Sequence, residues 1–264
     1  MESLFIYLNL SIIALLLFIF SIVALCFYKV RKIHLASYQI VSDLAKIRRE
    51  TDSLFNQIQA LLALERKLGL PEALPPMRGW AGSPDFLLNV ANEILVRKPK
   101  IIMECSSGVS TIVAARCAQI NGIGHVYSLE HDPEYSNATR KLLAQYGLSD
   151  WATVLDAPLV TKVTATPWYD EEVIPQSLKA IEILIIDGPP SSIAPLARYP
   201  ALPRLRERMA VNSLIIADDT FRPDEQEMLR RWQVEFPEFR QRQVYSEKGC
   251  TLLERDNTHK ISQE

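Results

Sequence analysis

Acidic residues recur in this 264-residue chain directly after short apolar runs. A carboxylate accepts hydrogen bonds and protons from hydroxyl groups, and it also binds hard cations. Any one of these acids could be a helix cap or a solvated loop residue. Their repeated position after successive apolar runs instead indicates a shared chemical site. The acids are Glu104, Glu130, Asp156, Asp187, Asp218 and Asp219.

The stretch from Lys100 to Pro133 is the most informative part of the chain. Its pattern predicts a strand that leads to Glu104, a turn of small residues, a helix over 109–120 and a second strand that ends at Glu130. A doubly wound sheet uses such a unit to hold a nucleoside at the carboxyl ends of its strands. The Glu130 carboxylate suits a ribose, because it accepts hydrogen bonds and a diol donates them.

Further apolar runs alternate with helical patterns, which is typical of a parallel sheet covered on both faces. The fold class is therefore α/β, with a doubly wound, mostly parallel sheet and an antiparallel terminal hairpin. The expected strands cover 153–155, 181–186 and 213–217, the hairpin joins 243–245 to 250–254, and the helices cover 84–96, 133–146, 201–209 and 224–236. The acids would then meet at one edge. An enzyme is excluded if Glu130 and Asp187 lie on opposite sides of the molecule, or if bulky side chains fill the gap between them.

The first 32 residues predict a transmembrane anchor. Leu4 to Tyr28 contains no charge, and about 25 helical residues span a ~30 Å hydrocarbon core. A cleaved signal peptide is the alternative, but it would have basic residues before a shorter apolar run. Here the basic residues Lys29, Arg31 and Lys32 follow the run, which predicts a single-pass protein with its carboxyl-terminal part in the cytoplasm.

Residues 33–70 predict a helical stalk, because Ile33 to Leu68 contains neither Gly nor Pro. Apolar residues recur every seven positions, which favours a coiled coil that makes a homo-oligomer. A single amphipathic helix on the surface of the domain is the alternative. Residues 71–79 form the expected linker and 80–264 the catalytic domain, in which Ser83 caps the first helix. The heptad residues are Ile33, Ile40, Ile47, Leu54, Leu61 and Leu68.

The composition excludes several other classes. The formal net charge is −2, and no strongly basic patch is present, so nucleic acid is not an expected partner. The four cysteines are Cys26, Cys105, Cys117 and Cys250, and their scattered positions argue against a zinc site and a disulfide framework. They suit a reducing compartment.

From about Trp80 to Arg255 the chain resembles the class I S-adenosylmethionine-dependent methyltransferases. A subgroup has the motifs E-x-G-S-G-x-S-T, D-G-P-P and D-D followed by Arg, and this chain has E-C-S-S-G-V-S-T from Glu104, D-G-P-P from Asp187 and D-D-T-F-R from Asp218. The resemblance implies S-adenosylmethionine as cofactor. It implies that Asp187 lies beside the transferred methyl group, that Glu130 and His131 bind the ribose of the cofactor, and that Asp156 and Ala157 lie beside its adenine. The residues implied to surround the methionine portion are Glu104, Ser106, Ser107, Gly108, Ser110 and Thr111.

Ser106 departs from the subgroup, which has glycine at this position. A Cβ atom restricts the backbone if the position needs a positive φ. We therefore expect strain or crowding at Ser106.

The later motifs also resemble the catechol-type O-methyltransferases, which hold a divalent cation. That resemblance implies that Asp187, Asp218 and Asp219 bind Mg²⁺ or a similar ion, which would polarise an acceptor hydroxyl. The alternative is a metal-free site in which Asp187 or Asp218 is the general base.

Other residues near the motifs have two interpretations each. His131 could be a base, but packing near the ribose or adenine is favoured. Trp168 and Tyr169 lie in a long connection that forms either an acceptor lid or a packed sheet edge. Arg198 and Arg222 either bind an anionic acceptor or lie solvated on the surface.

The sequence as a whole predicts a membrane-anchored methyltransferase that faces the cytoplasm and methylates oxygen. The expected acceptor is a small molecule, a lipid-linked saccharide, a lipid or a membrane protein. One alternative is a non-catalytic interaction module tethered to the membrane. Another is a different enzyme on this fold, such as an aminopropyltransferase or a nicotinamide-dependent oxidoreductase, although the latter's G-x-G-x-x-G motif is missing.

Overall fold

A computed structural model describes residues 2–77, 81–162 and 166–256 of the chain. The chain divides into two compact units, Met1–Phe55 and Asn56–Glu264. Each unit is described by itself below.

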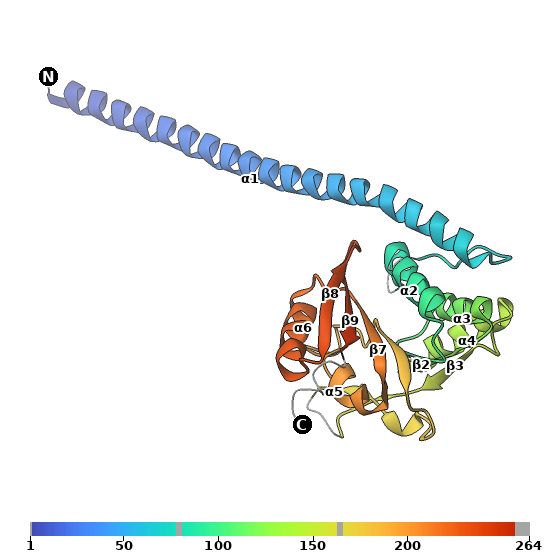
Figure 1. Cartoon of the computed structure of the whole chain (residues 1–264). Helices are drawn as coiled ribbons and strands as arrows, with labels where there is room; N and C mark the ends of the chain where they lie inside the picture. Colours follow the sequence, from blue (N-terminus) through green and yellow to red (C-terminus); the bar gives the residue numbers. More distant parts are fainter. Residues whose placement is uncertain (1, 78–80, 163–165, 257–264) are drawn as a thin grey trace. The chain divides into compact units, whose positions relative to one another are not determined.

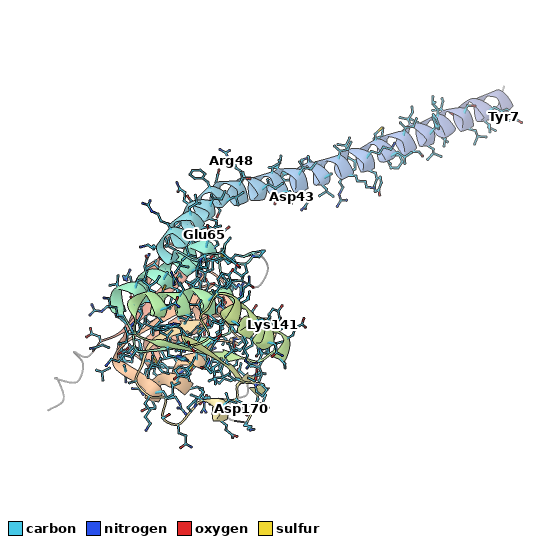
Figure 2. All side chains as sticks on the ribbon, turned by 90° about the vertical axis from the view of Figure 1, so that its right-hand side faces the viewer. Tyr7, Asp43, Arg48, Glu65, Lys141 and Asp170 are labelled. Carbon is cyan, nitrogen blue, oxygen red and sulfur yellow. The ribbon has the colours of Figure 1, made fainter. Side chains whose placement is uncertain are left out.

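The first unit is one helix, the greater part of α1 (Glu2–Leu68). Among the described residues, the segment Asn9–Ala45 is the one helical stretch long and apolar enough to cross a membrane, and an 18-residue window within it has a mean hydropathy of 3.0. Figure 2 labels Tyr7 near the start of α1 and Asp43 further along the same helix. The heptad residues Ile33, Ile40, Ile47 and Leu54 are all exposed.

The second unit contains the predicted sheet (Figure 1). Within the described residues its seven strands lie in the order β3-β2-β1-β6-β7-β9-β8. The first five are parallel, whereas β9 pairs antiparallel with both β7 and β8. The predicted fold class is therefore confirmed. The strands are β1 (Ile101–Cys105), β2 (His125–Glu130), β3 (Ala152–Asp156), β6 (Ile181–Ile186), β7 (Met209–Asp218), β8 (Phe239–Val244) and β9 (Cys250–Arg255).

Helices cover both faces of this sheet, as apolar strands require. One face packs against α2 (Pro84–Arg97), α3 (Val109–Asn121) and α4 (Pro133–Gln145). The other packs against α5 (Ala201–Leu205), α6 (Pro223–Glu235) and the connection before β6. Figure 1 shows α2 to α4 on one side of the strands and α6 on the other.

The connection from β3 to β6 has no helix of the usual length within its described residues. It forms the two-stranded sheet of β4 (Leu159–Val160) and β5 (Trp168–Tyr169), followed by the 3₁₀ turn η1 (Glu171–Val173). The predicted helix over 201–209 is also shorter, because it changes to the 3₁₀ turn η2 (Arg206–Arg208) and then enters β7 early. The first hairpin strand begins at Phe239 rather than at 243.

The last turns of α1 belong to the second unit. Leu64 and Leu68 are fully buried in the core with α2 and α3. The boundary between the compact units thus lies at Asn56, inside the segment expected to be a stalk. Arg116 of α3 supports this packing, because it donates to the carbonyl groups of Leu68 and Gly69.

Asp85, at the start of α2, connects three elements. Its carboxylate accepts hydrogen bonds from Gln57 of α1 at 2.8 Å, from Ser83 at 2.6 Å and from the backbone N–H of Glu247 in the β8–β9 turn at 2.6 Å. Ser83 stands at the predicted cap position, but its hydroxyl donates to Asp85 and does not cap the helix.

Candidate active site

The register of the sheet places the acids along one edge. Cys105 lies opposite Leu129 on one side and Ile186 on the other, so the residues after these three lie at the same level. Glu130 and Asp187 therefore project from the same edge, with β1 between their strands. At ~4.8 Å between neighbouring strands, the two backbones are about 10 Å apart.

The turn after β1 fills the middle of this edge. Ser106 has φ = 121°, a conformation that favours glycine, so the strain expected at this departure from the motif is present. Its N–H donates to the carbonyl of Leu129, and its own carbonyl accepts from the Ser128 hydroxyl. Gly108 has φ = 142° and precedes α3. The turn is thus held from β2.

Glu104 lies one residue below the edge and is fully buried. Its Oε2 accepts from Thr111 at 2.6 Å and from Ser128 at 3.0 Å, while Thr111 accepts from the N–H of Gly108. Burial raises the pKa of Glu104 to about 7, against the lowering effect of the hydroxyl groups of Ser110, Thr111 and Ser128. Glu104, Ser110 and Thr111 therefore form a polar group below the turn, and Thr111 holds the turn through the N–H of Gly108.

Glu130 accepts hydrogen bonds from three neutral donors, and His131 Nδ1 lies 3.0 Å from its Oε1 without a hydrogen bond. Its Oε1 accepts from the backbone N–H groups of His131 and Asp132, at 2.8 and 3.0 Å, and its Oε2 accepts from Ser107 at 2.8 Å. The side chain is 6% exposed. Three of about four acceptor positions are in use, so one remains for a ligand hydroxyl, and the Ser107 hydroxyl is able to exchange with a second.

Asp156 lies at the same edge, on the outermost strand, with 62% of its side chain exposed. It pairs with Arg140 at 2.8 Å. Ala157 is buried, and its N–H donates to the carbonyl of Glu130. Asp156 and Ala157 therefore lie next to Glu130, whereas two strands separate β3 from β6, which leads to Asp187.

The acids after β6 and β7 form a cluster. Asp187, Asp218 and Asp219 each offer a carboxylate oxygen within 4.8 Å of the others. Asp219 has φ = 60°, and the Oδ1 atoms of Asp218 and Asp219 are buried without a hydrogen-bond partner among the described residues. Burial raises the pKa of Asp187, with Arg198 opposing and Asp219 adding to the shift. Burial also raises the pKa of Asp218, and Asp187 and Asp219 raise it further.

Arg198 does not lie on the surface, so the predicted solvated position is wrong, whereas binding of an anionic acceptor stays a prediction. It is 4% exposed and inserts into the acid cluster. Its Nη2 lies 3.0 Å from Asp219 Oδ2 and 3.3 Å from Asp187 Oδ1. Arg222 is more exposed and pairs with Asp219 at 2.8 Å.

Trp168 and Tyr169 are packed, with exposed fractions of 3% and 1%. The Tyr169 ring meets that of His131 edge to face at 6.3 Å. A Cβ atom on Gly188 would lie 2.6 Å from the Tyr169 hydroxyl, which explains why only glycine fits there. Tyr169 therefore spans part of the interval between Glu130 and Asp187. Its hydroxyl is buried and has no partner in the part of the chain that the structure describes.

The structure thus brings most of the predicted site residues to one edge of the sheet, with Glu104 and Thr111 just behind it. The sequence analysis missed Arg198 as an internal ion-pair partner, Tyr169 as a side chain within the edge, and Glu225, which is buried 3.8 Å from Arg198. One signal was available for Arg198. It is the only charged residue between Asp187 and Arg204, in a stretch of small and apolar residues.

Comparisons with known proteins agree with this geometry. Residues 105–220, somewhat less than half of the chain, match a family described as a methyltransferase domain. No curated protein sequence matches the chain.

Solved structures share the fold at low sequence identity. A methyltransferase from Geobacter sulfurreducens aligns with a TM-score of 0.52 at 17% identity, covering 76% of this chain and 89% of that one. The SAH-bound methyltransferase PaMTH1 of Podospora anserina gives 0.55 at 15%, covering 75% and 88%. The O-methyltransferase TomG of Streptomyces achromogenes, in complex with SAM, gives 0.51 at 14%, covering 75% and 90%.

The resemblance noted in the sequence agrees with both findings: residues 105–220 match a methyltransferase domain, and solved methyltransferase structures share the fold of the chain.

Proposed function

We propose that this protein is a membrane-anchored methyltransferase that transfers the methyl group of S-adenosylmethionine to an oxygen atom. The observation that supports this most strongly is the shared edge on which Glu130 and Asp187 flank the Ser106–Gly108 turn. The cofactor-bound relatives named above support the choice of cofactor.

The proposed reaction needs little from the protein, because a sulfonium is already reactive. The acceptor oxygen attacks the methyl carbon, the carbon–sulfur bond breaks, and S-adenosylhomocysteine leaves. Asp187 or Asp218 accepts the hydroxyl proton. A raised pKa makes a carboxylate a better proton acceptor as long as the group stays ionised. This favours Asp187, whose pKa burial raises to about 6, over Asp218, whose pKa burial raises to about 8.

The remaining predicted cofactor contacts are also proposals. Ser106, Ser107 and Gly108 would surround the methionine portion, with Glu104, Ser110 and Thr111 behind them. Glu130 and His131 would bind the ribose, and Asp156 and Ala157 would lie beside the adenine. Tyr169 would have to turn outward, because its ring lies across part of this path.

A divalent cation does not fit the acid cluster as it stands. Asp187, Asp218 and Asp219 are donors of the right kind, but the guanidinium of Arg198 already lies between two of them. The proposed methyl transfer therefore involves no metal ion.

The membrane span supports a membrane-associated acceptor, such as a lipid, a lipid-linked saccharide or a membrane protein, over a freely soluble small molecule. The basic residues after the apolar run support a cytoplasmic catalytic domain. Incubating the membrane and soluble fractions of the source cell with methyl-labelled S-adenosylmethionine tests this. Label confined to soluble molecules would contradict the proposed acceptor class.

The exposed residues Ile33, Ile40, Ile47 and Leu54 support self-association of α1. Ile40→Asp together with Ile47→Asp should abolish cross-linking between copies of the full chain in membranes. Unchanged cross-linking would argue against a coiled coil.

Isothermal titration of the full chain in detergent with S-adenosylmethionine tests the cofactor. Glu130→Ala should weaken binding roughly 10- to 100-fold, because up to two charge-assisted hydrogen bonds are lost. Glu134→Ala, an exposed acid in the first turn of α4, is the control and should bind normally. If Glu130→Ala binds as tightly as the natural chain, the ribose assignment is wrong.

A second candidate function is a non-catalytic interaction module. The strained Ser106 and the Tyr169 side chain in the edge favour it. A natural chain that binds no S-adenosylmethionine at millimolar concentration would support this candidate and overturn the first.

A further inference from the structure

The buried guanidinium of Arg198 joins the carboxyl ends of β6 and β7. Its Nη2 donates to the carbonyl of Asp187 at 2.9 Å and its Nη1 to the carbonyl of Asp218 at 3.1 Å. Nη2 also donates to the carboxylates of Asp219 and Asp187, at 3.0 and 3.3 Å, and Nε to the carbonyl of Pro189 at 3.4 Å. Every nitrogen of the group thus has an acceptor.

Four acids surround this one buried cation. Asp187, Asp218 and Asp219 lie within hydrogen-bond reach of its nitrogens through a carboxylate or a carbonyl, and Glu225 Oε1 lies 3.8 Å from Nε. The other positive groups of the described chain that affect Asp187 are Arg222 and Lys248. Both are less buried than Arg198. The cluster depends on Arg198 for its internal positive charge.

A divalent ion would need the space and the ligands that Arg198 uses. Mg²⁺ binds oxygen at about 2.0–2.1 Å, so an ion shared by Asp187 and Asp219 must lie between them. Arg198 Nη2 is already in contact with one oxygen of each. An ion at that place would meet a fixed like charge at contact distance, in a site with little water to screen it.

We infer that Arg198 is the resident cation of this site, and that its guanidinium takes the place of a divalent metal between Asp187 and Asp219. The acid cluster is therefore metal-free in the working protein. All three nitrogens of Arg198 donate to the ends of β6 and β7 or to the residues that follow them, so it is a positioning residue that sets the distance between these ends and keeps their acids in place. This inference rests on the proposed function for the reaction, but its test reads metal binding directly.

The first experiment uses the full chain in detergent and titrates it with Mn²⁺, followed by electron paramagnetic resonance. Mn²⁺ is a good probe because it prefers oxygen ligands, as Mg²⁺ does. No stoichiometric binding at millimolar Mn²⁺ is expected. One bound Mn²⁺ per chain that is lost in Asp219→Asn would overturn the inference.

The second experiment removes the guanidinium. Arg198→Met leaves four buried acids without their central partner, so this variant should gain at least tenfold in Mn²⁺ affinity over the natural chain. Arg198→Lys keeps a positive charge and should stay metal-free. Arg222→Met removes the neighbouring, more exposed partner of Asp219 and should also stay metal-free, because Arg198 is still present.

If Arg198→Met does not fold in metal-free buffer, thermal unfolding with added Mn²⁺ replaces the titration. Recovery of a folding transition with Mn²⁺, but not with added salt of equal ionic strength, supports the inference. Absence of recovery, or equal Mn²⁺ binding by Arg198→Met and the natural chain, overturns it. A chain that binds no S-adenosylmethionine defeats the proposed function, whereas all of these metal measurements can still be read.

Discussion

The two ends of the candidate site hold their carboxylates by different means. Glu130 is held by a serine hydroxyl and two backbone N–H groups, all of them neutral. The cluster around Asp187 is held by one buried guanidinium among several acids. A hydroxyl group of a ligand can replace a neutral donor of the protein, because both donate the same kind of hydrogen bond to the carboxylate. A charge cluster needs a counter-charge that stays, and in this cluster the Oδ1 atoms of Asp218 and Asp219 are buried without a hydrogen-bond partner among the described residues.

The largest effect should come from breaking the charged end. Arg198→Met leaves buried acids unpaired and should lower the free energy of unfolding by about 3–5 kcal/mol. Arg140→Met breaks the ion pair with Asp156 on the outermost strand beyond Glu130, where Asp156 is 62% exposed, and should lower the free energy of unfolding by less than about 1 kcal/mol. Urea unfolding followed by tryptophan fluorescence measures both. Equal losses would show that the two ends do not differ in this way.

A pH effect should test the buried acid behind the turn that lies between the two ends. The folded-state pKa of Glu104, about 7, is above its usual value of 4.5, so the folded state holds this proton more tightly than the unfolded chain does. Its contribution to stability is complete below pH 4.5 and is lost as the pH rises to about 7. The change is about 3 kcal/mol at most.

Glu104→Gln should remove this contribution, so that the free energy of unfolding falls less steeply between pH 4.5 and 7 than in the natural chain. The acids of the charged end keep their own contributions in this variant. Glu134→Gln, at an exposed position, is the control and should keep the natural slope. The same slope in all three proteins would show that Glu104 does not hold a proton in this range.

The smallest effect concerns Tyr169, which lies between the two ends. Its buried hydroxyl has no partner among the described residues, so Tyr169→Phe should raise the free energy of unfolding by about 1 kcal/mol in the absence of cofactor. Tyr146→Phe is the matched control. The Tyr146 hydroxyl donates to the carbonyl of Ala73 at 2.6 Å, so its loss should lower stability by about as much. Thermal unfolding that moves both variants in the same direction would contradict this account.

The sheet and its acidic edge could be predicted because apolar runs mark buried strands, and the residue after each run must lie at the end of its strand. The strain at Ser106, where φ is 121°, was also predictable, because the family that the chain resembles has a glycine at this position. The strand pattern depends on local sequence alone, whereas the strain at Ser106 was predicted from the resemblance.

The contacts of Arg198 could not be predicted in the same way. They depend on the path of the chain between β6 and α5, which brings Arg198 back to the carbonyl groups of residues 187, 189 and 218. A local pattern cannot specify that path. The position of Tyr169 has the same origin, because it depends on the path of the long connection between β3 and β6, which forms the β4–β5 pair. The sequence therefore predicted the acidic edge of the sheet, but not the other side chains that lie within it.

The burial of Leu64 and Leu68 determines where the chain can be cut to obtain a soluble catalytic fragment. A fragment that starts at Asn56 keeps both leucines on α2 and α3, together with the Gln57–Asp85 hydrogen bond. A fragment that starts at Trp80, the first residue of the resemblance, lacks Leu64 and Leu68. It would expose an apolar surface on α2 and α3 and should aggregate during purification. Expression trials should therefore start the fragment before the last turns of α1, although the sequence assigns those turns to the stalk.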